Sequence, residues 1–223
     1  MTSRWQKERE AIVAAGREIA AKGLVAGSAG NVSMRLGDAE LLAITPRGKR
    51  YDAFSAADVQ VIDFAAEPVE GDQVPSVESL MHIAAYRARP DARAVVHTHS
   101  IYASVLAVAH LSLPPLIDEM VTSLGGEICV AEYAFPSSEE LAEHAAKGLV
   151  GRNAVLLANH GVVGIGKDLR DAIGVCELVE RAAQVYVFAK AIGRVNLLPP
   201  DVVESEQELF KMLHFKPPGE SVG

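Results

Sequence analysis

The sequence predicts a single α/β domain, an α/β/α sandwich in which helices cover a central mixed, mainly antiparallel sheet. Short apolar runs with strand character alternate with longer segments of helical periodicity. Several strand candidates are joined by turns too short for a parallel crossover. The 223 residues are 49% hydrophobic and show no repeat or long linker, so we expect residues 1–223 to form a single domain around one core. Residues 210–223 are expected to be a flexible tail or a segment that orders over an active site.

The first half of the chain predicts a helix, three short strands and a second helix. Residues 3–22 repeat apolar side chains every seven positions, and Gly23 is placed to end that helix. Ser76 is placed to cap a helix that reaches Arg89, since a proline follows. The expected strands lie near residues 31–36, 40–45 and 59–63.

The second half predicts strands that alternate with helices. Residues 93–99 contain an apolar core typical of a buried strand, and a helix follows it. Ser137 and Glu140 have the spacing of a capping box for a helix to about residue 150. A last long helix with an apolar stripe is expected at 168–193. The other expected strands lie at 127–133, 154–158 and 162–165.

Charge and hydropathy exclude several classes of partner. The formal net charge is −8 and no segment is rich in Lys or Arg, so we expect no nucleic-acid or anionic-membrane binding. Apolar stretches are short, and the first ten residues are polar and unlike a signal peptide, so a cytoplasmic protein is expected. The two cysteines, Cys129 and Cys176, are in apolar contexts typical of buried, inert thiols.

Three histidines follow two apolar strand candidates. His97 and His99 flank one threonine at a strand end, so their side chains point to the same face and can share one metal ion. Taken alone, such a pair is more often two polar residues at the end of a strand. His160, in an Asn-His-Gly turn after another apolar strand, supplies a third imidazole. Three histidines with an open fourth position indicate a catalytic site for Zn²⁺, although Mn²⁺, Co²⁺ or Fe²⁺ also suit these ligands.

Glu78 is the candidate acid/base. It follows Pro75-Ser76 at the start of the expected helix, in an otherwise apolar context. The simpler interpretation is a first-turn carboxylate that complements the helix dipole. Its catalytic interpretation depends on proximity to the histidines.

Seven short stretches, in order along residues 8–193, carry a family resemblance. They are residues 27–33, 44–48, 75–78, 82–86, 89–91, 94–99 and 159–161. Together they resemble the class II aldolase/adducin family, and the pattern is nearest to its L-fuculose-phosphate aldolase branch.

The resemblance implies a metal-dependent aldehyde-lyase. It makes His97, His99 and His160 the metal ligands, and Glu78 a carboxylate that completes the resting coordination and moves a proton. The implied reaction cleaves a small, phosphorylated ketose similar to L-fuculose-1-phosphate into dihydroxyacetone phosphate and an aldehyde, by way of a metal-stabilised enediolate. The resemblance also implies a homotetramer with active sites at subunit interfaces.

The implied substrate phosphate lies against backbone N–H groups of two turns and a helix start. These groups belong to Gly30, Asn31, Arg47, Gly48 and Ser76. Arg47 and Val77 depart from the fuculose-phosphate branch, which has hydroxyl residues at both places. Arg47 is expected to bind phosphate, or a substrate carboxylate instead, unless it is a surface arginine.

Glu119 is a third departure, because the fuculose-phosphate branch has a catalytic tyrosine near this place. A glutamate followed by methionine is similar to the methylthioribulose-1-phosphate dehydratase branch, so Glu119 is a candidate acid/base, or else an interface charge. A dehydratase, an epimerase or another sugar-phosphate lyase is therefore the enzymatic alternative. An adducin-like structural module is the alternative of another class, and the intact histidines and Glu78 argue against it.

Overall fold

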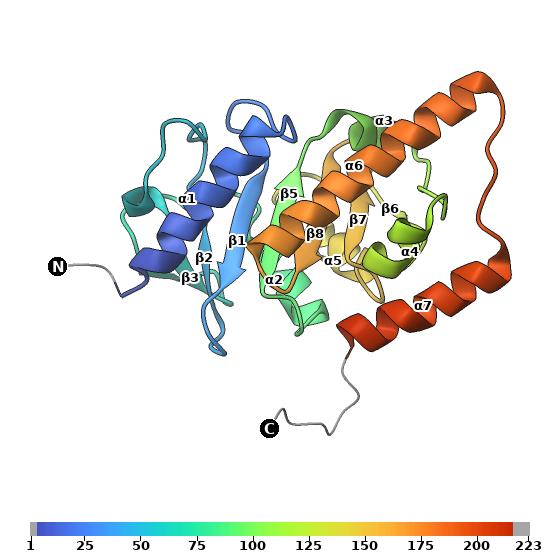
Figure 1. Ribbon diagram of the computed structural model, residues 1–223. Coiled ribbons are helices and arrows are strands. Elements are labelled where there is room, and N and C mark those ends of the chain that lie inside the picture. The colour runs from blue at the N-terminus through green and yellow to red at the C-terminus, as the bar shows by residue number, and fades with distance from the viewer. Residues whose placement is uncertain (1–3, 216–223) are drawn as a thin grey trace.

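One mixed sheet with helices on both faces forms the computed structural model, which describes residues 4–215 (Figure 1). The strand order is β4-β3-β2-β1-β5-β8-β7-β6, and every neighbouring pair is antiparallel except β6 and β7. The strands are β1 (Asn31–Arg35), β2 (Leu41–Ile44), β3 (Gln60–Asp63), β4 (Pro68–Glu70), β5 (Ala94–Thr98), β6 (Val130–Ala131), β7 (Ala154–Leu157) and β8 (Gly161–Gly166). The expected fold class is confirmed.

Helices cover the sheet on both sides. They are α1 (Gln6–Ala21), α2 (Ser79–Ala88), α3 (Ile101–Ala109), α4 (Asp118–Leu124), α5 (Glu139–Gly148), α6 (Leu169–Ile192) and α7 (Pro200–His214), with a short 3₁₀ turn at Ala56–Asp58. The pair α2 and α5 packs on one face, and α1, α3 and α6 pack on the other (Figure 1). Within residues 4–215, no helix has the length and apolar character needed to span a bilayer.

Strand alternation divides the core between these two layers. Val95 and Val163 point into the cluster beneath α2 and α5, whereas Val96 and Val162 point to the opposite face. Because these residues are fully buried, β5 and β8 are central strands covered on both faces. Their ends are therefore a stable place from which to project functional side chains.

Three local predictions at helix starts and strand ends were wrong. The second helix begins at Ser79, and Ser76 lies in the preceding turn, where its Oγ accepts a hydrogen bond from the Glu78 backbone N–H at 3.3 Å. Ser138, not Ser137, caps α5, because Ser137 has a left-handed backbone (φ 71°) and cannot present its hydroxyl to the helix. Of the strand expected at 127–133, only Val130–Ala131 (β6) pairs with β7.

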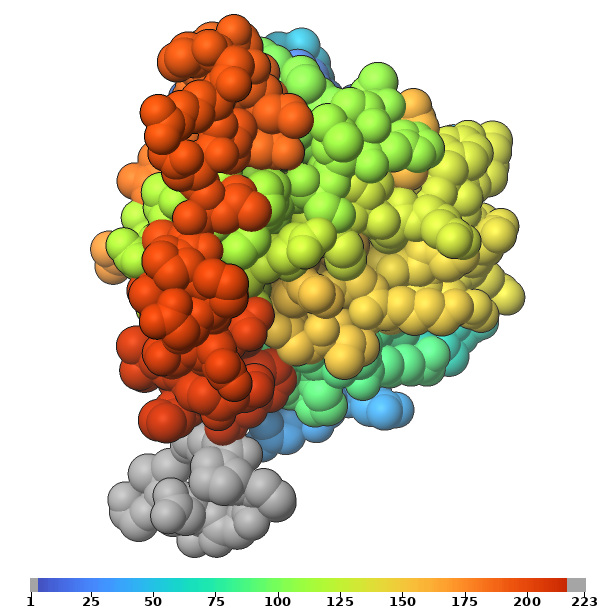
Figure 2. Space-filling model, turned by 90° about the vertical axis from the view of Figure 1, so that its right-hand side faces the viewer, coloured from blue at the N-terminus to red at the C-terminus, as the bar shows by residue number. Residues whose placement is uncertain are grey.

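The C-terminal part of the described chain forms a helix that the sequence analysis did not predict. Helix α7 lies along α4 on the outside of the molecule (Figures 1 and 2). Phe210 is buried there, and Gln207 Nε2 donates to the Gly125 carbonyl oxygen at 3.2 Å. Residues 210–214 therefore belong to a docked helix, whereas residues 216–223 of the expected tail lie outside the described residues.

Candidate metal centre and active site

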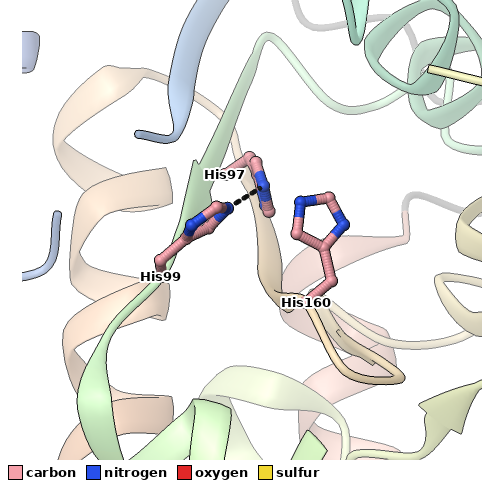
Figure 3. A group of neighbouring side chains, drawn as sticks. All are labelled: His97, His99 and His160. Atoms are coloured by element: carbon pink, nitrogen blue, oxygen red, sulfur yellow. Dashed lines mark hydrogen bonds between the residues drawn. The ribbon is translucent and has the colours of Figure 1, made fainter. Parts of the chain in front are cut away.

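The candidate site lies where β5 ends and β8 begins. These strands are antiparallel neighbours, with His97 opposite Val163, so both positions fall at one edge of the sheet. His97 is on β5, His99 is the first residue after this strand, and His160 immediately precedes β8. Figure 3 shows the three rings pointing toward one another from these two segments. The sequence prediction that the three histidines converge is confirmed by this geometry.

The nitrogens of these rings have the spacing of ligands to one metal ion. His97 and His99 Nε2 atoms are 2.9 Å apart, and the ring centroids of all three histidines lie 4.7–4.9 Å from one another. Glu78 completes the set, with one carboxylate oxygen 3.5 Å from His97 Nε2 and the other 3.3 Å from His160 Nε2. Ligands at 2.0–2.1 Å around a tetrahedral ion are about 3.3 Å apart, which matches this arrangement.

Protonation also favours metal binding. His97 Nδ1 lies 3.0 Å from the Val162 carbonyl oxygen, to which it donates its proton, so that Nε2 presents a lone pair to the centre. Burial, with the neighbouring His160 and His99, holds the pKa of His97 well below its usual value. Burial and His160 likewise lower the pKa of His99. Neutral imidazoles at neutral pH are the form that binds a metal.

One unsatisfied atom within residues 4–215 also fits a metal ligand. Glu78 Oε1 is buried and has no hydrogen-bond partner among the described residues. Buried polar atoms are rarely left without a partner, and a functional site is one of the usual reasons. We conclude that the residues present fit a divalent metal ion held by His97, His99, His160 and Glu78.

Two glycines let the backbone approach the site closely. A Cβ at position 161 would collide with the Thr98 carbonyl oxygen and lie 3.0 Å from His99 Cδ2. A Cβ at Gly30, which has φ +74°, would lie 2.5 Å from the His97 carbonyl oxygen. Gly30 therefore has a packing role beside β5, whatever part it plays in phosphate binding.

The segments around Arg47 and Ser76, which are expected to bind phosphate, lie side by side, but two of their backbone N–H groups already form hydrogen bonds within the chain. An isolated bridge between Pro46 and Pro75 joins the two segments. Through it Arg47 N donates to Val74 O at 2.9 Å, and Ser76 N donates to the oxygen of the residue before Pro46 at 3.0 Å. These two backbone N–H groups therefore already have partners within the chain, and phosphate binding at this place stays a prediction. The exposed Arg47 side chain, the Gly48 backbone and the Ser76 hydroxyl remain candidates.

Asn31 makes a side-chain contact in addition to the phosphate binding expected of its backbone. Its Nδ2 donates to Glu78 Oε2 at 2.7 Å, so the amide contacts the candidate acid/base directly. Asn31 and His97 are also register partners on β1 and β5. The sequence analysis missed this contact, since the two residues are far apart in the chain.

Glu119 is not brought to the histidines within this chain. It is exposed on α4 and forms an ion pair with Arg181 of α6. It lines a cavity of about 780 Å³ together with Gly166 and Lys167, at the opposite end of β8 from His160. An acid/base role for Glu119 at the metal centre would therefore need a second copy of the chain.

The fold and site together describe an α/β domain whose three converging histidines can hold a metal ion. Comparison with known proteins gives its family. The family model for the class II aldolase and adducin N-terminal domain matches residues 10–187. A 5-deoxy-D-ribulose 1-phosphate aldolase from Bacillus thuringiensis serovar kurstaki is 38% identical over 92% of this chain and 96% of its own. An L-fuculose phosphate aldolase from Escherichia coli K12 is 36% identical over 87% of this chain and 89% of its own.

A solved structure of an L-fuculose 1-phosphate aldolase is 36% identical and superimposes with a TM-score of 0.88, covering 95% of this chain and 98% of that one. The chain belongs to the class II aldolase and adducin N-terminal domain family. The expectation of a lyase of this family is confirmed, because its relatives are aldolases. The named relatives act on sugar phosphates.

Proposed function

We propose that this protein is a metal-dependent aldolase that cleaves a small phosphorylated ketose into dihydroxyacetone phosphate and an aldehyde. The observation that carries the proposal is the convergence of His97, His99, His160 and Glu78 on one point. Ketoses similar to L-fuculose-1-phosphate and 5-deoxyribulose-1-phosphate are the proposed substrates, which the names of the relatives support.

Zn²⁺ is the proposed ion, with Mn²⁺, Co²⁺ or Fe²⁺ as substitutes. When bound, such an ion supplies a Lewis acid that stabilises negative charge on substrate oxygens. In the cleavage direction the C3–C4 bond breaks, the C4 hydroxyl loses its proton to become the aldehyde, and the electron pair stays with C3. Glu78 is the proposed carrier of the proton that C3 gains.

The proton lost from the C4 hydroxyl requires a second group, for which we propose Glu119 of a neighbouring copy. This assignment is consistent with the expected homotetramer whose active sites lie at subunit interfaces. An apolar stripe on the outer face of α3 supports association, since Ile101, Val105 and Val108 are exposed there.

A retro-aldol assay tests the proposal. The metal-loaded protein is incubated with L-fuculose-1-phosphate or 5-deoxyribulose-1-phosphate, and dihydroxyacetone phosphate is read through a coupled dehydrogenase. We expect metal-dependent release that disappears in His97→Ala and falls sharply in Glu78→Gln. Absence of release from a protein that holds one metal ion per chain would overturn the proposal for these substrates.

Two arginines of one turn test phosphate recognition. Arg47→Ser should raise the KM for a phosphorylated ketose by about 10-fold or more, because a charge-assisted hydrogen bond contributes roughly 1.5–3 kcal/mol. Arg50→Ser is the matched control, since Arg50 is exposed and pairs with Asp52. Equal KM values for the two variants would remove Arg47 from the proposed substrate site.

The dehydratase alternative is favoured by Glu119 and the methionine that follows it. With methylthioribulose-1-phosphate, a dehydratase would expel water and release no dihydroxyacetone phosphate. Detection of a dehydrated ketone as the sole product would therefore replace the aldolase assignment. We also propose a cytoplasmic location, which the unpaired Cys129 and Cys176 support because disulfides form in oxidising compartments.

A further inference from the structure

A continuous chain of hydrogen bonds leads from Glu78 into the core beneath α2. Asn31 Nδ2 donates to Glu78 Oε2 at 2.7 Å, and Asn31 Oδ1 lies 2.5 Å from His82 Nε2. His82 Nδ1 lies 2.6 Å from Ser33 Oγ, which lies 2.8 Å from Tyr86 Oη. All five side chains are buried, so water does not compete for these contacts. We call these five residues the Glu78 relay.

The relay follows from the periodicity of two elements. His82 and Tyr86 are one helical turn apart on α2 and therefore share a face. Asn31 and Ser33 are two residues apart on β1 and share a face of the sheet. Because β1 pairs with β5, the relay ends beside the strand that carries His97.

The carboxylate at one end determines the direction of every hydrogen bond. An ionised Glu78 can only accept, so the Asn31 amide must direct its N–H group to Glu78 and its oxygen to His82. His82 Nε2 must then donate, and its Nδ1 must accept from Ser33. The Ser33 hydroxyl has one proton, which it uses for His82, so Tyr86 donates to Ser33 Oγ.

The environment of His82 agrees with this assignment. His82 is fully buried and its ring contacts two uncharged side chains, those of Asn31 and Ser33, so the ring is neutral and carries one N–H. No member of the relay is then left with a clash between two donors or two acceptors. The structure thus contains one consistent set of proton positions.

We propose that His82 is a positioning residue of the aldol reaction, held as its neutral Nε2–H tautomer so that the Asn31 amide keeps its N–H group on Glu78. The His82 ring contacts Asn31 and Ser33, and it reaches the Glu78 carboxylate only through Asn31. Its backbone N–H donates to the Glu78 carbonyl oxygen at 3.3 Å, a helical contact that leucine or glutamine at this position keeps. Without the His82 ring, the buried Asn31 oxygen loses its donor, and the amide is held on the Glu78 carboxylate by a single contact. The kinetic consequence rests on the proposed aldolase function, whereas the tautomer does not.

The first experiment reads the tautomer and does not depend on activity. Nitrogen-15 NMR of the ring nitrogens in the full-length protein distinguishes a protonated from an unprotonated nitrogen, and His82→Gln assigns the signals. We expect a protonated Nε2 and an unprotonated Nδ1 at neutral pH. A protonated Nδ1, alone or with Nε2, would overturn the proposal, even if the wild-type protein proved to have no aldolase activity.

The second experiment compares two substitutions of His82. Leucine removes the donor to Asn31, whereas glutamine can donate from its amide nitrogen in a similar place. We expect His82→Leu to lower kcat 10- to 100-fold, the usual range for a partner of a ligating residue, with KM changed less than about 2-fold. His82→Gln should recover most of kcat. Ile19→Val, a buried change on α1, is the control for general loss of packing and should keep the wild-type kcat.

The Asn31→Ala background tests whether His82 acts through Asn31. If it does, adding His82→Leu to Asn31→Ala should cost no further activity. A second loss as large as the first would overturn the proposal, as would an equal fall in kcat for Ile19→Val. Wild-type inactivity would instead contradict the proposed function and leave the NMR result to decide the relay.

Discussion

His110 and Asn159 are linked by a hydrogen bond, with His110 Nε2 donating to Asn159 Oδ1 at 2.8 Å, and both have a left-handed backbone. Their φ angles are 53° and 57°. The Asn159 backbone N–H also donates to the Ala107 carbonyl oxygen at 3.2 Å. The turn that presents His160 is therefore attached to the end of α3, the helix that follows His99.

Replacement of Asn159 should separate backbone strain from the loss of this hydrogen bond. Asn159→Ala must keep a left-handed backbone, which costs about 1–2 kcal/mol for a residue with a Cβ, and it loses the bond to His110. Asn159→Gly loses the same bond without the strain. We expect the free energy of unfolding, measured in urea, to fall more for alanine than for glycine. Equal losses would show that the backbone conformation contributes nothing.

Gly161 should be as important as a metal ligand, although it binds no metal. Gly161→Ala would force the Thr98 carbonyl group and the His99 ring away from β8. We expect metal affinity, measured by chelator competition, to fall at least 10-fold. Gly174→Ala is the control: position 174 is inside α6 with open space around it, so this change should stabilise the protein by roughly 0.5–1 kcal/mol. Unchanged metal affinity in Gly161→Ala would contradict the steric argument.

The three histidines of the candidate metal centre were predictable from sequence because short-range patterns mark them. The spacing of His97 and His99 places both side chains on one face of a strand, and His160 follows another apolar strand. Antiparallel pairing of β5 and β8, which are far apart in the chain, then brings the two segments together, and the structure supplies that pairing. The central strands and the longest helix were predictable for the same reason, since their periodicity is strong.

Contacts that depend on tertiary packing were not predictable. Nothing local to Asn31 indicates that its amide contacts Glu78, because α2 and β1 meet only in the folded chain. The second buried histidine, His82, gave a weak signal, as it follows Glu78 by one helical turn. Helix α7 was missed because its one buried anchor, Phe210, lies among polar residues and its partner surface is α4.

The buried His82 should make the metal-free protein sensitive to acid. Its pKa is about 3 in the folded protein, against 6.5 as the ordinary value, so between these pH values the unfolded chain binds a proton that the folded chain does not. The part of the free energy of unfolding that depends on a neutral His82 is therefore fully present above pH 6.5 and is lost as the pH falls toward 3. From pH 7 to pH 5 the free energy of unfolding should fall by about 2 kcal/mol from this group.

Urea unfolding at pH 7 and pH 5, with a chelator present, measures this dependence. His82→Gln removes the titrating ring, so the variant should lose about 2 kcal/mol less than the wild type between these pH values. The quantity compared is the change in the free energy of unfolding between pH 7 and pH 5 within each protein. A lower overall stability of the variant therefore does not affect the comparison. Identical pH dependence in the two proteins would show that His82 titrates normally.

Metal binding should stabilise the folded protein. An ion at 100 times its Kd contributes about 2.7 kcal/mol if it binds only the folded state, which for a chain of this size corresponds to a rise in Tm of roughly 5–10 °C. Thermal unfolding with and without Zn²⁺ measures this shift. His97→Ala should abolish it, since His97 is the buried centre of the ligand set. His144→Ala should keep it, because His144 lies on α5 and contacts the Glu132 carbonyl oxygen instead. A full shift in His97→Ala would show that the stabilising ion binds elsewhere.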